Sequence, residues 1–405
     1  MISNITKTNL IKFWICIIII SFGTSPAFAL DSSNMNLLLI GIMLISPIIL
    51  LISIRSIGIV DILLILFMLS IIFSPLLNHP ETMRWSTVIY SSMFIVSFIT
   101  YKQLLYKDVF KIEDFEKLIR YLIYAYALVL IIQQLCVLLG LPIFNLSNYN
   151  PAEPWKLNSL TSEPSHSARI MGLLMFSFIL IKQSILNRKY SFSMDSKSDR
   201  IVWVSFFWTM ITMNSGTAFL FIIIIFSLFL NFKNILALIF SIFLVTILIN
   251  FLDITSFERT FKIIEATTTF NINEIIRADP SAATRIIPMM LLSQLADISS
   301  VNGWFGHGID HVSTILNNLV YIGGMPDNWS GGGMFLIWIE YGFLSFFLFT
   351  IISFISIFDK KNLFTIVFWF FLVFMYGVNS QIVWITIILL FTIKYFKKKR
   401  ESVRK

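Results

Sequence analysis

Long runs of apolar residues follow one another along most of the chain, and short polar stretches separate them. A helix needs about 20 apolar residues to cross the hydrocarbon core of a bilayer. The runs recur often enough to predict an all-α polytopic membrane protein with about 12 transmembrane helices. We place these spans at residues 11–30, 35–54, 57–77, 84–101, 121–142, 168–186, 201–213, 217–231, 234–252, 332–357, 363–376 and 378–394.

The apolar run from residue 201 to residue 231 has two interpretations. It is either one long tilted helix, or two short spans joined by a turn at Asn214-Ser215-Gly216, which is a turn signal. The choice matters because it decides on which side of the membrane every later segment lies.

Basic residues favour the two short spans. With the amino terminus inside, 23 of the 30 Lys and Arg residues fall in cytoplasmic segments, and this positive-inside bias holds only if the run is a hairpin. We therefore predict that both termini are cytoplasmic. Seven basic residues remain on the outer side: Arg84, Lys156, Arg169, Arg259, Lys262, Arg277 and Arg285.

Composition supports the same class of protein. Hydrophobic residues make up 57% of the chain and charged residues 13%, which excludes an ordinary soluble fold. The net charge of +8 is concentrated in tails such as 394–405, which suits anionic lipid rather than nucleic acid. Residues 1–29 also fit a cleavable signal peptide ending at Ala27-Phe28-Ala29, but we favour an uncleaved first helix.

Two outer segments are long enough to carry chemistry in what we interpret as one integral membrane domain, 1–405. They are the loop 143–166 and the large loop 253–331, which is rich in charged residues and glycine. Loops held by a rigid scaffold often carry function, so we expect the active site in the large loop. The alternative is a solvated lid.

Arginine dominates the basic residues of the outer side, five of the seven. Its planar fork suits phosphate and carboxylate oxygens. Arg169 and Arg285 each follow a predicted helix start, at Glu163-Pro164 and at Asp279-Pro280, and helix N-termini bind anions. We interpret both as parts of an anion site, and Arg84 as an interfacial residue that snorkels to the membrane surface.

Two acidic residues fall within predicted spans. Glu340 lies about eight residues into its span, where an ionisable group is costly and is usually paired or functional. We expect an outer arginine or a water-filled cavity beside it. Asp61 lies near the inner end of its span and is interpreted as interfacial.

His307 and His311 are four residues apart, a spacing found in some zinc sites on helices. Gly306 and Gly308 argue against a helix there, and the glutamate of the metalloprotease pattern is absent. We therefore predict no metal site. The chain also lacks nucleotide-binding motifs, so no cofactor is expected.

Several short motifs occur in a fixed order within this layout. They are Ser162-Glu163-Pro164-Ser165 with Arg169, Asn214-Ser215-Gly216-Thr217, Arg277, Ser281-Ala282-Ala283-Thr284-Arg285, Gly306-His307-Gly308, Asp327-Asn328-Trp329, and Trp338-Ile339-Glu340-Tyr341-Gly342. In their order and topology the chain resembles the Wzy-type polymerases of O-antigen and exopolysaccharide repeat units. Their superfamily also contains the O-antigen ligases. Ligases have a His-Asn pair where this chain has Asp327-Asn328, which disfavours the ligase interpretation.

The resemblance implies a metal-independent, inverting glycosyltransferase on the outer face of the bacterial inner membrane. Its donor would be an oligosaccharide on undecaprenyl diphosphate, and its acceptor the sugar of another lipid-linked unit. The product would be the O-antigen of lipopolysaccharide, or an exopolysaccharide. A flippase and a chain-length regulator would be partners.

Residue roles follow from this chemistry. Arg169, Arg277 and Arg285 would bind the diphosphate and stabilise its developing charge. Asp327 would activate or orient the acceptor hydroxyl, and Glu163 is a competing base that mainly positions Arg169. His307 and His311 are the next candidates for the base after these two carboxylates. Together with Asn328 and Glu340, the two histidines are also expected to bind substrate.

Two rival functions remain open. An O-antigen ligase would transfer the same glycan to a lipid A core. A flippase or transporter would catalyse no reaction, but transporters place ionisable groups near the midplane and often show inverted repeats. Here the polar residues gather on the outer side.

Overall fold

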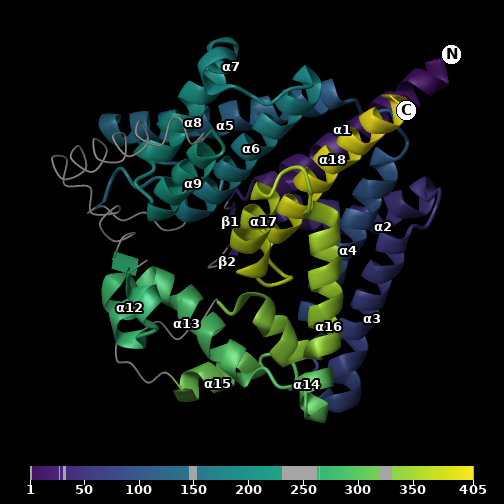
Figure 1. The fold of residues 1–405 in the computed structure, drawn as a ribbon, viewed down its shortest axis with the longest axis vertical. Coiled ribbons are helices and arrows are strands. Elements are labelled where there is room, and N and C mark those ends of the chain that lie inside the picture. Colours follow the sequence, from purple (N-terminus) through teal and green to yellow (C-terminus); the bar gives the residue numbers. More distant parts are fainter. Residues whose placement is uncertain are drawn as a thin grey trace. The chain divides into compact units, whose positions relative to one another are not determined.

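A computed structural model describes residues 2–26, 28–30, 33–145, 153–229, 262–263, 265–319 and 331–404. These residues are mostly α-helical (Figure 1). Five helices are long and apolar enough to cross a membrane, which is consistent with an all-α membrane protein. They are α3 (Ile59–Asn78), α4 (Trp85–Leu105), α5 (Ile112–Leu139), α6 (Pro164–Leu186) and α16 (Gly333–Ile357).

Other apolar segments form shorter or more polar helices. They are α1 (Ile2–Gly23), α2 (Leu37–Ser53), α8 (Arg200–Thr212), α9 (Gly216–Ser227), α17 (Phe364–Trp369) with the π-helical turn η3 (Phe370–Phe374), and α18 (Gln381–Arg404). The span predicted at 234–252 lies outside the described residues.

The amino-terminal helix ends earlier than predicted for the span 11–30. Helix α1 ends at Gly23, and β1 (Phe28–Leu30) pairs antiparallel with β2 (Ser33–Met35). Pro26 explains the early end, because the residue before a proline avoids helical geometry and proline itself donates no backbone hydrogen bond.

The turn predicted at residues 214–216 is confirmed. Helix α8 ends at Thr212 and α9 begins at Gly216. Asn214 between them has a left-handed φ of 48°, a conformation that asparagine tolerates better than most residues. The two helices contact each other.

The chain folds into two compact units, which we describe one at a time. The first unit comprises Met1–Phe22, Ile40–Val109 and Ala266–Lys394. The second comprises Gly23–Leu39, Phe110–Glu265 and Tyr395–Lys405.

In the first unit, α16 packs along α3, and α4 packs on the same helix. Stacked aromatic rings join α3 to α16, where the centroids of Phe67 and Phe349 lie 5.0 Å apart. A buried ion pair joins α3 to α4, with Lys102 Nζ 2.6 Å from Asp61 Oδ1. Asp61, predicted to be interfacial, is therefore buried in the first turn of α3 and neutralised there by a lysine.

The large loop predicted at 253–331 is largely helical in its described part, and four of its helices are described over their whole length. They are α12 (Ile272–Ala278), α13 (Pro280–Leu295), α14 (Val301–Phe305) and α15 (His311–Leu319). Helix α13 begins at the predicted proline. The loop is anchored by apolar contacts, because Leu292 of α13 and Leu316 of α15 pack with Ile339 of α16.

In the second unit, α6 packs against α5 and α9. Proline at the first position of α6 fits its predicted start, and Glu163 is the N-cap residue. Gly172 permits the approach of α9, because a Cβ atom there would overlap the ring of Phe221. A short helix, α7 (Phe192–Ser198), connects α6 to α8.

Candidate functional site

A glycine-containing turn leads from α14 to α15 in the first unit, and we call residues 306–311 the histidine turn. Gly306 and Gly308 have φ values of 83° and 95°, which favour glycine. A Cβ atom on Gly306 would overlap the backbone carbonyl of Glu340, and one on Gly308 would overlap Thr82. The sequence prediction that this segment is not helical is confirmed up to Asp310, and His311 begins α15.

Backbone hydrogen bonds hold the histidine turn from two sides. From the α3 side, Asn78 Nδ2 donates to the Gly306 carbonyl at 2.6 Å, and the Ile309 N–H donates to Thr82 Oγ1 at 3.2 Å. From α16, the Ile339 carbonyl accepts from the His307 N–H at 2.7 Å. Figure 1 shows α14 at the ends of α3 and α16 from which these groups come.

Glu340 completes this support from inside α16. Its side chain is buried, with 6% of the residue exposed, and Oε1 accepts from the Asp310 N–H at 3.1 Å. The expected partner was an arginine or a cavity. The described hydrogen-bond donor is instead the backbone of the histidine turn.

Arg84 reaches the same turn by another route. Its Nη1 lies 2.6 Å from Asp310 Oδ2, and both side chains are more than half exposed. Arg84 is therefore an ion-pair partner of the large loop, which corrects the interpretation as a residue that only snorkels. The loop returns Asp310 to the start of α4, a contact that no local pattern reveals.

Helix α16 is interrupted directly after this region. Gly342 has φ 86° and ψ 168° within the helix, and a Cβ atom there would overlap the carbonyl of Trp304 in α14. The interruption therefore lets α14 and the histidine turn lie close against α16.

The two imidazole rings of the turn stack on each other. The centroids of His307 and His311 are 5.0 Å apart, with 10° between the ring planes. Neither ring has a hydrogen bond to another residue in the described part of the chain, and Nδ1 of His307 is buried. Both rings are thus held in place by the backbone while their nitrogens are left for a ligand.

His79 is a third histidine at this site, and sequence analysis missed it. Its Nδ1 lies 3.0 Å from Glu81 Oε1 and its Nε2 lies 3.4 Å from Asn302 Oδ1. Burial first, and then the nearby His307 and His79, lower the pKa of His311 below its usual value. His311 is therefore neutral near pH 7. Among the described residues, no group of three or more His, Cys, Asp or Glu side chains is arranged to hold a metal ion.

A signal for His79 was present in the topology. It follows the end of the predicted span 57–77 on the outer side, as His307 and His311 do in the large loop. All four histidines of the chain, His166 included, were therefore expected on one side of the membrane.

The three arginines predicted to bind diphosphate belong to different units. Arg277 is exposed in the last turn of α12, and Arg285 is half-buried in α13 of the first unit. A Cβ atom on Gly331 would come within 2.6 Å of the Arg285 backbone, so the chain entering α16 passes close to α13 there. Arg169 is buried in α6 of the second unit, with 4% of the residue exposed.

Polar side chains surround the start of α6, close in sequence to Arg169. Buried Ser167 Oγ lies 2.8 Å from Thr161 Oγ1, and Asn158 Nδ2 donates to the Thr161 carbonyl at 2.6 Å. Glu163 Oε2 accepts from the Ser165 hydroxyl at 3.2 Å. A helix N-terminus with a buried arginine suits an anion, as the sequence indicated. Asp327 and Asn328, the remaining predicted site residues, lie outside the described residues.

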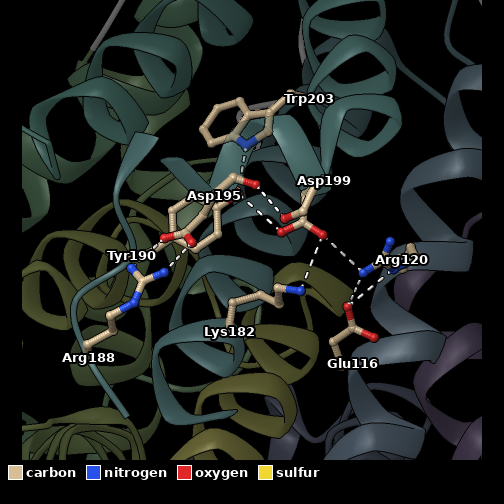
Figure 2. Close-up of polar contacts among 9 residues, drawn as sticks. Glu116, Arg120, Lys182, Arg188, Tyr190, Asp195, Asp199 and Trp203 are labelled. Carbon is tan, nitrogen blue, oxygen red and sulfur yellow. Dashed lines mark hydrogen bonds and ion pairs between the residues drawn. The ribbon is translucent and has the colours of Figure 1, made fainter. Parts of the chain in front are cut away.

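A second polar cluster lies in the second unit, and Figure 2 shows it. Asp199 Oδ1 lies 3.1 Å from Arg120 Nη2 and 3.2 Å from Lys182 Nζ, and its Oδ2 accepts from Tyr190 at 3.3 Å. We call this cluster the Asp199 network. Its members are Glu116, Arg120, Lys182, Arg188, Tyr190, Asp195, Asp199 and Trp203.

Charge is balanced within the Asp199 network, which contains three basic and three acidic side chains. Arg188 binds Asp195 with two hydrogen bonds, of 2.8 and 2.5 Å, and this pairing holds the pKa of the carboxyl below its usual value. Trp203 Nε1 donates to the Tyr190 hydroxyl at 3.0 Å. The network joins α5, α6, α7 and α8 and needs no added ligand, so we interpret it as structural.

Searches against protein-family models, curated proteins and solved structures found no match to this chain. The class that the structure defines is therefore an all-α membrane protein, and its function must be argued from the site.

Proposed function

We propose that the protein polymerises lipid-linked oligosaccharide repeat units into O-antigen or exopolysaccharide. The reaction is a metal-independent, inverting glycosyl transfer on the outer face of the bacterial inner membrane. The donor glycan is carried by undecaprenyl diphosphate, and the acceptor is the sugar of a second lipid-linked unit.

One observation carries the proposal: the histidine turn is attached to the ends of apolar helices that are long enough to cross a membrane. Asn78 is the last residue of α3, Arg84 precedes α4, and Glu340 lies in the second turn of α16. A lipid-linked saccharide is likewise divided into an apolar and a polar part. Its polyprenyl chain belongs in the bilayer and its sugars lie beside the membrane. Groups that accept hydrogen bonds from hydroxyls are thus available where the sugars would be.

The arginines supply the second requirement, which is stabilisation of the leaving diphosphate. Arg169 lies in the second turn of α6, a 23-residue helix whose N-terminus carries a partial positive charge. In the first unit, Arg285 and Arg277 are the guanidinium groups that the sequence assigns to the diphosphate. Preorganised donors of this kind are each worth about 3–4 kcal/mol of transition-state stabilisation.

Reconstitution tests the proposal directly. Purified protein in liposomes is supplied with undecaprenyl-diphosphate repeat units and no lipid A core, and the products are separated by length. We expect chains of many units. Chains transferred only when a core acceptor is added would identify a ligase, and lipid-linked units that cross the bilayer unchanged would identify a transporter.

The arginine assignment has its own test in the same assay. Arg285→Lys should lose nearly as much polymer as Arg285→Ala, because an ammonium group cannot replace a planar fork that binds two oxygens. Arg169→Lys should behave in the same way. Arg200→Lys, at an exposed arginine at the start of α8, serves as the control and should retain full activity. Wild-type chain lengths in both site variants would remove the arginines from the mechanism.

A further inference from the structure

The histidine turn has a firmly held backbone and side chains that are open to a ligand. Its backbone is bonded from α3 and from α16, whereas the imidazole rings have no hydrogen bond to any described residue. Such an arrangement costs stability unless the rings meet a ligand, because a buried nitrogen without a partner loses its hydrogen bonds to water.

We propose that His311 is the catalytic residue that accepts the proton of the acceptor hydroxyl, and that Glu340 and His307 position it. This assignment rests on the proposed function. It takes the role of base from Asp327 and Glu163 and gives Glu340 a supporting role in place of direct substrate binding.

Geometry distinguishes the two histidines. His307 directs Nδ1 into the protein, and its backbone N–H is fixed by the Ile339 carbonyl. His311 is half-exposed at the first position of α15, so a substrate can approach its ring. Stacking on His307 limits the orientation of the His311 ring, which is what a general base requires.

Glu340 acts on His311 through the backbone. Its side-chain Oε1 accepts the N–H of Asp310, the residue directly before His311, from a buried position in α16. Loss of this acceptor would release the start of α15 and with it the His311 ring. Glu340 is therefore a positioning residue.

Charged and titratable groups lie on each element around the histidine turn, and two of them, His307 and His79, act electrostatically on His311. His79 and Glu81 come from the segment after α3, Arg84 from the start of α4, Asp297 from the segment before α14, and Glu340 from α16. His307 and Asp310 belong to the turn itself. Acidic groups outnumber Arg84, so this site repels a diphosphate and favours a neutral sugar.

The reaction balances without a cofactor. The acceptor hydroxyl oxygen forms a bond to the anomeric carbon of the donor sugar, and its proton moves to an imidazole nitrogen of His311. The bond between the anomeric carbon and the phosphate oxygen breaks on the opposite face, and the electron pair leaves on the undecaprenyl diphosphate. A neutral imidazole is needed at the start, and the lowered pKa of His311 provides it near pH 7.

The test uses the same full-length protein in liposomes with undecaprenyl-diphosphate repeat units. We expect His311→Ala and His311→Gln to lower kcat about 100-fold or more with little change in KM, since a general base typically contributes 10²–10⁴-fold. Glu340→Gln retains an oxygen that accepts the Asp310 N–H and should stay within about threefold of wild type, whereas Glu340→Ala should lose more. Arg200→Lys, at an exposed residue at the start of α8, again serves as the control and should be fully active.

His307→Phe gives a readout that does not depend on the folding of the His311 variants. Phenylalanine keeps an aromatic ring for stacking but removes the charge that lowers the pKa of His311. The ascending limb of the plot of kcat/KM against pH should therefore move upward, toward the ordinary histidine value of about 6.5.

Two results would overturn the assignment while the proposed function stands. In the first, the wild-type enzyme polymerises and His311→Gln keeps more than about one-tenth of the wild-type kcat. Loss of a general base should lower kcat by about 10²-fold or more. In the second, the ascending limb of kcat/KM against pH is the same in His307→Phe as in wild type. That result would point to a carboxylate such as Asp327 or Glu163 as the base. Wild-type protein that forms no polymer would instead reject the proposed function itself.

Discussion

The Asp199 network of the second unit and the histidine turn of the first unit are both polar clusters at the ends of apolar helices. In the network, each charged side chain has a partner of opposite charge, and the tyrosine and tryptophan are hydrogen-bonded as well (Figure 2). In the turn, the backbone is bonded but the two imidazole rings are not bonded to described residues.

This difference separates a structural role from a chemical one. A network that satisfies its own groups has nothing left for a ligand, and it gains by fastening helices together. A turn whose side-chain nitrogens have no hydrogen bonds lacks this stabilisation. Such a loss of stability is expected where a bound substrate supplies the missing hydrogen bonds. Mutations in the two clusters should therefore have different consequences, on stability in one and on activity in the other.

The largest effect on stability is expected from Asp199→Ala. Removal of this buried carboxylate leaves Arg120 and Lys182 without their shared partner, and breaking a buried pair costs about 3–5 kcal/mol. Thermal unfolding in detergent and the amount of protein in the membrane measure this loss. Glu113→Gln, at an exposed carboxylate of α5, is the control and should change neither quantity. Equal stability of the two variants would show that the network is not structural.

A medium effect is expected from Gly342→Ala, which perturbs the support of the histidine turn. The backbone conformation at Gly342 is nearly restricted to glycine, and the added methyl group would overlap the Trp304 carbonyl. Strain of this kind costs about 1–3 kcal/mol. We expect the catalytic rate to fall by more than the loss of stability explains, because α14 and the turn must shift. Gly41→Ala, where a Cβ atom meets nothing within 4 Å, is the matched control.

The smallest effect on stability is expected from the exposed pair of Arg84 and Asp310, and the pair of Arg188 with the buried Asp195 should matter more. Exposed ion pairs contribute little, so Arg84→Ala should leave the unfolding temperature unchanged within error, whereas Arg188→Ala leaves a buried carboxylate without its partner and should lower that temperature. The two variants should differ in activity. Arg84→Ala frees Asp310 beside His311 and should slow polymerisation, whereas Arg188→Ala should not. Equal activity of the two variants would show that Arg84 has no part in the site.

Basic residues of the predicted cytoplasmic loops illustrate how one feature can serve two purposes. Arg120, Lys182 and Arg188 were counted as signals of membrane orientation, and the structure places each of them against a carboxylate. The count could not reveal these pairings, because it registers the number of charges in a segment and not their neighbours.

Local patterns in the sequence determined the helical character of the chain and several helix ends. In the described part of the chain, apolar runs of sufficient length form helices, and proline at 164 and 280 and the Asn214 turn mark boundaries through backbone geometry alone. The failure at the first span has the same origin, since Pro26 was overlooked within an apolar run. The two glycines of the histidine turn were also interpreted correctly from their conformational preferences.

Only the tertiary structure decided which distant residues meet. Arg84 pairs with Asp310 across 226 positions, and Asp61 pairs with Lys102 across 41. His79 joins the site through Asn302, although nothing next to it in the chain marks it as functional. Each of these contacts depends on where a segment returns after crossing or leaving the bundle, and packing over the whole unit sets that position. Sequence therefore supplied the helices and the chemical candidates, and three-dimensional packing selected the ones that form a site.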